Sequence, residues 1–389
     1  DCKYLLTAST DNTSRIWNIK PKENPIFTGH TARVSDAGFS PPGLQGKYIV
    51  TAAWDYSARV WDMVGNNLRI FQHGYYLVDH AVFYPNGQFV LTACADGYAR
   101  IWNLNNSEVK SFKVFDYRFD VKISPDGKCI LTWPWSENEK GVKLYDNTGI
   151  QIQWFKNSRF ANFSSNGKYI ITVNQKNQSF IWKRKNNNLA YEKLLKLKGE
   201  AGNIISAAFS PDDNYIITGA EDNTAKIWDM KGNLLQTLVG HSAKVTQVKF
   251  WYPGSKHKNI LTVALDNTAR LWNINGNLIA VLKGHSDIIN DVNFSPDSKF
   301  VVTGSNDNTV RIWDLNGKEL QLFPGHKAAV TKVQFSSDGS YILSASNDHT
   351  ARLMPVSIED VLHKINVEKV RGTVFQLSKD GKQVYGIVD

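Results

Sequence analysis

Short runs of β-branched and aromatic residues alternate with polar turns along most of the chain. Typical runs are Tyr215–Thr218 and Phe300–Thr303, and Asp-Gly, Asp-Asn or Pro-Asp pairs bound them. Val, Ile, Tyr and Phe favour strands, whereas Asp, Asn, Gly and Pro interrupt them. The pattern therefore predicts an all-β chain of short strands, with helix disfavoured in these segments.

A tryptophan, or a residue in its place, recurs about every 42 residues. In seven of the nine units an Asp stands six residues before this anchor, and in eight a Thr or Ser stands ten before it. A four-stranded sheet of this length cannot bury both of its faces alone, so neighbouring sheets must pack around an axis as a propeller. The anchors are Trp17, Trp61, Trp102, Tyr145, Trp182, Trp228, Trp272, Trp313 and Met354.

Two dipeptides repeat in step with these anchors. The first, Gly-His, occurs at Gly29-His30, Gly240-His241, Gly284-His285 and Gly325-His326. The second, Trp-Asp, occurs at Trp61-Asp62, Trp228-Asp229 and Trp313-Asp314, and its variant Trp-Asn occurs at three further anchors. With these motifs the chain resembles the WD-repeat (WD40) family of β-propellers over nearly its whole length. The resemblance implies blades of four antiparallel strands and a non-catalytic scaffold for protein–protein interaction.

The resemblance also implies a buried hydrogen-bond network in each blade, running from His through Thr or Ser and Asp to the indole N–H. A fully satisfied network of this kind makes a blade rigid. Three blades contain the complete set, namely His30, Thr51, Asp55 and Trp61; His241, Thr262, Asp266 and Trp272; and His285, Thr303, Asp307 and Trp313.

Other repeats depart from this set. Glu200 replaces the His before Trp228, and the dipeptide is inverted at His73-Gly74. The units that end at Tyr145 and Trp182 carry Glu139 and Lys176 in place of the Asp. We predict that these two blades are the least stable or the most specialised.

Nine anchors exceed the seven or eight blades of the commonest rings of the family. Either the ring is unusually large, or the chain is a window on a tandem array of two rings. The array is favoured, because the chain opens with second- and third-type strands at 4–9 and 14–19 and shows no spare strand that could close a ring. We expect propeller blades over 1–356, with an incomplete first blade, and a C-terminal segment over 357–389.

The repeat pattern of strands and turns ends after Pro355. Ser357 followed by Glu359 and Asp360 predicts a short helix over 357–364, because Ser caps helices and acidic side chains favour their first turn. Residues 374–388 are either the first two strands of another blade or a tail.

Composition narrows the function classes. Lys and Arg number 45 against 36 Asp and Glu, and a net charge of +9 on 389 residues is a mild bias that disfavours a dedicated nucleic-acid binder. Three cysteines without a C-x-x-C pair favour a reducing compartment, so we expect a cytoplasmic protein. No run of about 18 apolar residues occurs, so no membrane association is expected.

The recurring His, Asp and Thr could suggest hydrolytic triads or metal ligands. A catalytic site is normally single, whereas this set repeats blade after blade. The histidines also lack a second ligand three or four residues away. We therefore expect no enzyme, cofactor or metal site.

Variable residues on the repeated frame are the candidates for partner binding. By resemblance, they point to the narrower face near the central channel. The candidates are Asp36, Trp54, His80, Asp120, Phe160, Glu221, Gln247, Asp291 and Lys332.

Two aromatic features leave alternatives open. Trp54 either packs between blades or, with Tyr56, Tyr75 or Tyr76 near it, anchors a partner. The segment Trp133-Pro134-Trp135 is either a recognition loop, which we favour, or a hydrophobic plug.

Three functional classes follow. The favoured one is a protein-binding scaffold that forms the C-terminal sensing region of a larger multidomain signalling protein, by analogy with such chains. The alternatives are a propeller enzyme that uses Asp36, His80, Asp120 or Asp291 at the channel mouth, and a weak nucleic-acid binder.

Overall fold

The computed structural model describes residues 4–8, 14–18, 25–41, 47–106, 108–136, 140–186, 188–198, 202–251, 258–356, 373–377 and 384–388. The chain divides into two units. One comprises Pro25–Val356, and the other combines Asp1–Asn24 with Ser357–Asp389.

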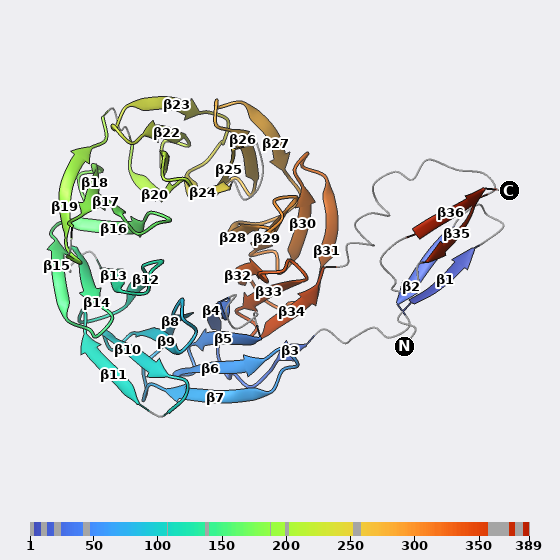
Figure 1. Cartoon of the computed structure of the whole chain (residues 1–389), viewed down its shortest axis with the longest axis horizontal. Coiled ribbons are helices and arrows are strands. Elements are labelled where there is room, and N and C mark those ends of the chain that lie inside the picture. Colours follow the sequence, from blue (N-terminus) through green and yellow to red (C-terminus); the bar gives the residue numbers. More distant parts are fainter. Residues whose placement is uncertain are drawn as a thin grey trace. The chain divides into compact units, whose positions relative to one another are not determined.

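The larger unit is a ring of eight blades, each a four-stranded antiparallel sheet with its first strand innermost (Figure 1). Blades 1 to 4 are β4–β7 (Val34–Phe39, Tyr48–Ala53, Ser57–Asp62, Asn67–Gln72), β8–β11 (Val78–Phe83, Phe89–Cys94, Tyr98–Asn103, Val109–Lys113), β12–β15 (Phe119–Ile123, Cys129–Pro134, Val142–Asp146, Gln151–Phe155) and β16–β19 (Ser158–Phe163, Tyr169–Asn174, Ser179–Arg184, Tyr191–Lys196). Blades 5 to 7 are β20–β23 (Ile204–Phe209, Tyr215–Ala220, Ala225–Asp229, Leu234–Leu238), β24–β27 (Val245–Trp251, Asn259–Ala264, Ala269–Asn273, Leu278–Leu282) and β28–β31 (Ile289–Phe294, Phe300–Ser305, Val310–Asp314, Glu319–Phe323). Blade 8 is β32–β34 (Val330–Phe335, Tyr341–Ser346, Ala351–Pro355) with β3 (Ile26–Phe27) as its outer strand.

The short strand β3 closes the ring. Ile26 pairs with Arg352 and Phe27 with Ala351, and Leu353 N–H donates to the Pro25 carbonyl at 3.0 Å. Phe27 is fully buried among residues of blade 8 and Trp61 of blade 1. The first residues of the ring thus complete the blade made by its last residues.

This closure corrects the blade count. The ring holds eight anchors, Trp61 to Met354, and not nine, because Trp17 lies in the other unit. The statement that no spare strand could close a ring is also wrong, since β3 is that strand. A two-residue strand is too short to show an alternating pattern, so its sequence gives no strand signal.

The smaller unit contains two hairpins in its described part. β1 (Tyr4–Ala8) pairs with β2 (Ser14–Asn18), in agreement with the two strands expected at 4–9 and 14–19. β35 (Thr373–Leu377) pairs with β36 (Val384–Val388). The helix predicted over 357–364 lies outside the described residues, and the described part of the chain contains no helix, so none there could span a bilayer.

The core lies between neighbouring blades. Trp313 of blade 7, for example, packs with Leu271 and Leu282 of blade 6, and Trp61 of blade 1 packs with Leu343 and Leu353 of blade 8. Both faces of each sheet are therefore buried against a neighbour, and burial of such apolar surface is the main stabilising term.

Most inner strands carry a bulge near their first residue. Seven of the eight inner strands, all except β12, show a register shift between their first residue and the residue two positions later. A bulge re-aims the side chain that follows it. The shifted residues are Asp36, His80, Phe160, Ser206, Gln247, Asp291 and Lys332.

Candidate functional site

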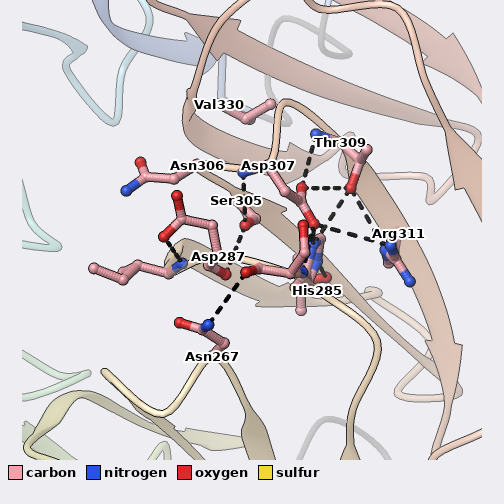
Figure 2. A network of polar contacts seen from close by, with 12 residues as sticks. Asn267, His285, Asp287, Ser305, Asn306, Asp307, Thr309, Arg311 and Val330 are labelled. Carbon is pink, nitrogen blue, oxygen red and sulfur yellow. Dashed lines mark hydrogen bonds and ion pairs between the residues drawn. The ribbon is translucent and has the colours of Figure 1, made fainter.

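The polar network of blade 7 shows how the repeated residues are used (Figure 2). His285 Nδ1 lies 2.8 Å from Asp307 Oδ2, and His285 Nε2 lies 2.7 Å from Thr303 Oγ1. The Trp313 indole N–H donates to the same Thr303 oxygen at 2.9 Å. Since an ionised carboxylate only accepts, Nδ1 carries the proton and the Thr303 hydroxyl donates to Nε2.

The same contacts recur in three other blades. The His–Asp distance is 2.8 Å in blade 1 and 2.9 Å in blade 6, and the His–Thr distance is 2.7 and 2.8 Å. The indole N–H of Trp61 and of Trp272 donates to Thr51 and Thr262. In blade 8, His326, Ser344 and Asp348 form the first two contacts, and Met354 stands where the indole would be.

Two further members of the network were missed by the sequence analysis. Thr309, two residues after Asp307, donates to the Asp at 2.6 Å, and Arg311, four residues after it, lies 3.9 Å away. A Cβ added to Gly284 would lie 2.6 Å from the Arg311 guanidinium, so the Gly of the Gly-His pair makes room for this arginine. The signal is present in the sequence as an Arg or Lys two residues before most anchors.

Burial and hydrogen bonding keep these groups in one protonation state. Burial lowers the pKa of His241 and of His285 below the usual value, which keeps both imidazoles neutral. Burial raises the pKa of the Asp55 carboxyl, but bonds from His30, Ser57 and Thr31 N–H outweigh it and bring the pKa to about 2. In blades 6 and 7 the set is thus a neutral imidazole held by an ionised carboxylate, with its hydrogen-bonding groups turned inward.

The degenerate blades keep only parts of the network. In blade 2, His73 accepts from Arg100 at 3.3 Å, and burial lowers its pKa to about 3. In blades 4 and 5 the indole-to-Thr bond remains, at 2.9 and 3.1 Å. Positions 139 and 200 lie outside the described residues.

Three partner-binding candidates, from the inner strands β4, β8 and β12, meet. His80 of blade 2 lies between two carboxylates, with Nδ1 at 3.3 Å from Asp36 Oδ2 and Nε2 at 2.9 Å from Asp120 Oδ1. Burial lowers the pKa of His80, but the two aspartates outweigh it and raise the pKa to about 10. His80 is therefore an imidazolium at neutral pH.

Blades 6 to 8 carry a second charge cluster. Asp291 Oδ2 accepts the Val333 N–H at 3.2 Å, and the ammonium groups of Lys249 and Lys332 lie 3.5 and 3.7 Å from its carboxylate. Burial raises the pKa of Asp291, but the two lysines outweigh it, so the pKa is lowered. Gln247 donates to the Asn290 carbonyl in the neighbouring strand.

The remaining candidates have separate surroundings. Phe160 packs edge-on against Trp133 with 5.5 Å between ring centroids, and Glu221 forms an exposed ion pair with Lys244 at 2.6 Å. Within the described residues no group of three or more His, Cys, Asp or Glu is placed to hold a metal ion.

The aromatic side chains of blades 1 and 3 form a stack with two arginines. The guanidinium of Arg118 lies 4.8 Å from the Trp54 ring and 4.1 Å from the Trp135 ring, and that of Arg33 lies 4.7 Å from Trp54. Arg118 also forms two bonds to Asp79, at 2.9 and 2.5 Å. We refer to Arg33, Trp54, Asp79, Arg118 and Trp135 as the aromatic–arginine cluster.

The structure gives the surroundings of both aromatic features, and their roles in partner binding stay predictions. Trp54 is half-buried between guanidinium groups, which combines packing with a place on the surface. In the Trp133-Pro134-Trp135 segment, Trp133 is buried in the core between blades 3 and 4, while Trp135 is 48% exposed.

Comparisons with known proteins agree with this architecture. The family model described as "WD domain, G-beta repeat" matches residues 22–62, 65–103, 191–229, 232–273, 276–314 and 317–353, more than half of the chain. No curated protein sequence gives a match. Among solved structures, the crystal structure of the C-terminal WD40 domain of Sif2 is similar, with a TM-score of 0.72 at 16% identity over 86% of this chain and 98% of that one.

Proposed function

Because the chain belongs to the WD40-repeat family of β-propellers, whose members generally serve as protein-interaction scaffolds, we propose that it is a non-catalytic scaffold that binds a protein partner across the channel-mouth face. The proposal rests on the contrast between the buried residues that repeat in the blades and the residues after the bulges, which vary. The His, Asp and Thr sets repeat and bond to each other inside the blades. The residues that follow the inner-strand bulges differ from blade to blade.

A rigid frame suits this role. Side chains held by bulges and inter-blade ion pairs lose little conformational entropy when a partner binds. The contacts of His80 with Asp36 and Asp120 join three consecutive blades, and those of Asp291 with Lys249 and Lys332 join three others. The face is thus ordered before a partner arrives.

The enzyme alternative has less support from the same groups. His80 lies between two carboxylates, but a pKa of about 10 leaves it without a free lone pair at neutral pH, so it cannot act as a general base. Asp291 is ion-paired with two lysines. Neither group is poised as a general base.

Site-specific photo-crosslinking tests the proposal. A photoreactive amino acid at Glu221 or Lys332, two of the residues that we propose face the partner, should crosslink a protein partner in a lysate of the source organism. The same amino acid at Trp154 or Leu235, exposed on outer strands, should not. Equal crosslinking at both sets, or none at the face, would contradict the proposal.

Salt dependence separates the scaffold from nucleic-acid binding. Phosphate contacts release counterions, so binding that collapses steeply as salt rises indicates nucleic acid. A protein partner held by packed side chains should be retained at high salt.

The wider setting also forms part of the proposal. We place the ring in the C-terminal sensing region of a larger multidomain signalling protein in the cytoplasm, on the basis of its regular repeats and its sparse, unpaired cysteines. The sequence of the complete coding region, together with fractionation of cells, tests this placement.

A further inference from the structure

The aromatic–arginine cluster arises from one structural position used twice. The residue that follows each second strand donates its N–H to the carbonyl of the residue before the inner strand: Trp54 to Arg33 in blade 1, and Trp135 to Arg118 in blade 3. The other blades have Ala95, Gln175, Glu221, Leu265, Asn306 and Asn347 at the Trp position. The Trp–Arg pair is therefore specific to blades 1 and 3.

Exposed tyrosines extend this cluster over blades 1 to 3. Tyr56 follows the turn Asp of blade 1, and its ring lies edge-on to Tyr75 of the loop before blade 2, with 6.2 Å between centroids. Tyr76 and Tyr117 stand in the loops before β8 and β12. The exposed fractions are 37% for Tyr56, 88% for Tyr75, 53% for Tyr76, 55% for Tyr117 and 48% for Trp135. These tyrosines lie on the loops that adjoin the strands carrying the cluster, and we refer to them and the cluster together as the aromatic patch.

Tyr56 is held in a backbone conformation that does not favour tyrosine. Its φ is +68°, in the left-handed region, where Gly, Asn and Asp are the usual residues. The equivalent residues in six other blades are Gly97, Asn177, Asn223, Asn267, Asn308 and His349, all with positive φ. A strained position that keeps an exposed aromatic ring is a sign of function, because packing within the fold does not explain it.

One of the two arginines in the patch lacks an ion pair among the described residues. Arg33 and Arg118 bring two guanidinium groups, and Asp79 supplies one carboxylate, which binds Arg118. Among the described residues Arg33 has no ion pair, and its Nε and the Trp54 Nε1 have no hydrogen-bond acceptor. A carboxylate from a partner would give Arg33 the ion pair that it lacks among the described residues.

We propose that the aromatic patch binds a short peptide segment of a protein partner in which a carboxylate side chain stands near an aromatic or aliphatic one. The apolar side chain packs on Tyr56, Tyr75 and Trp135, and the carboxylate pairs with Arg33. Rigid aromatic anchors with an arginine are the side chains that contribute most to binding free energy at protein interfaces. This inference rests on the proposed scaffold function and names the chemistry of its partner.

A nucleic-acid strand fits the patch less well, although bases also stack on aromatic rings. Arg33 is its one cation without an ion pair among the described residues, because Arg118 is already paired with Asp79. A phosphodiester backbone brings one charge per nucleotide, and a single unpaired guanidinium would neutralise only one of these charges.

Peptide selection against the whole chain tests the proposal. A phage-displayed library of short random peptides is panned on wild-type protein and on Arg33→Glu. Wild type should enrich peptides with Asp or Glu near an aromatic or aliphatic residue, and Arg33→Glu should enrich Lys or Arg in place of the acid. Lys244→Glu makes the same change at the equivalent position of blade 6 and should select as wild type does.

Titration of one enriched peptide gives the size of the effect. We expect Arg33→Glu to weaken binding of this peptide about tenfold or more. Replacement of the acidic residue of the peptide by its amide should weaken binding to wild type but should have no further effect on binding to Arg33→Glu. Trp135→Ala and Tyr56→Asn should each weaken binding about tenfold or more, as truncation of an aromatic anchor does. Leu265→Ala, at the position of blade 6 equivalent to Trp135, should leave it unchanged.

The outcomes separate this inference from the scaffold proposal. Peptides whose binding is lost in Lys244→Glu or Leu265→Ala, but kept in Arg33→Glu and Trp135→Ala, would overturn the patch and leave the scaffold intact. Absence of any enriched peptide, or Trp135-dependent binding of an oligo(dT) or oligo(U) probe in its place, would also overturn it. Thermal unfolding of every variant shows whether a loss of binding reflects a loss of fold, and the expected stability of Tyr56→Asn makes that variant decisive.

Discussion

A few repeated side chains account for the rigidity of each blade. The imidazole of His285 links Asp307 on one side to Thr303 on the other, and Thr303 in turn accepts the indole N–H of Trp313. Every donor in this series of hydrogen bonds has an acceptor. Polar groups can be buried without a large cost in free energy only when this condition is met.

Removal of one member should therefore leave its partners unsatisfied. We expect His285→Leu to lower the free energy of unfolding by about 1–3 kcal/mol, because Asp307 and Thr303 lose a buried partner. Urea denaturation measures the change. His349→Asn is the matched control, since His349 is exposed and its φ of +68° suits Asn, and it should cause no loss.

The charge of His80 should make stability depend on pH in the alkaline range. Its pKa in the fold is about 10, above the usual value near 6.5, so the Asp36 and Asp120 contacts stabilise the protein fully below that usual value. This stabilisation is lost as the pH rises from about 6.5 to about 10.

The measurement is the thermal midpoint across this range for wild type and for His80→Gln. Wild type should lose stability with rising pH, and the variant should show a flatter profile. Parallel profiles would contradict the assigned pKa of His80.

At the scale of the strand and turn, position within the blade decides which residues are tolerated. The residue after the turn Asp adopts positive φ in seven blades, and Asn or Gly fills five of these positions. Tyrosine at this turn in blade 1 costs about 1 kcal/mol relative to a residue suited to the left-handed region.

Exchange of residues between turns tests this cost. We expect Tyr56→Asn to raise the free energy of unfolding by about 1 kcal/mol, because the left-handed conformation favours Asn. The reverse change in blade 7, Asn308→Tyr, should lower it by a similar amount. Denaturant titration of both variants gives the two differences, and equal signs would refute the argument.

The blades that lack parts of the network should open first. Blades 3 and 4 have no His–Asp contact among their described residues, and the stretch between 104 and 190 carries no matched WD40 repeat. We expect amide hydrogens of β13 and β17 to exchange faster than those of β25 and β29 in blades 6 and 7. Equal protection in a hydrogen-exchange experiment would show that inter-blade packing alone sets blade stability.

The sequence predicts the repeated elements far better than the contacts between them. The strands, the anchors and the His–Thr–Asp–Trp sets follow from spacing, because each is local to one blade. The stack of Trp54 on Arg118 joins residues 64 positions apart in different blades, and no spacing rule connects them. The bulges that aim Asp36 and Asp291 likewise depend on pairing between strands and not on composition.

At the scale of the whole molecule, the closing strand β3 joins the last blade of the ring to the first. Phe27 is fully buried between blades 8 and 1, whereas its neighbour Ile26 is exposed. We expect Phe27→Ala to lower the free energy of unfolding by about 3–5 kcal/mol, and Ile26→Ala to have little effect. Chemical denaturation measures both, and similar effects of the two changes would mean that β3 does not hold the ring closed.

Closure by β3 also dictates an order of events during synthesis. Among the strands of the ring, the one that completes blade 8 leaves the ribosome first, and its partner β34 is made more than 300 residues later. Until then the newborn chain exposes the outer edge of an unfinished sheet and an unburied Phe27, and such surfaces invite association with other chains. Assistance from a chaperone would matter most in the interval before residue 352 emerges.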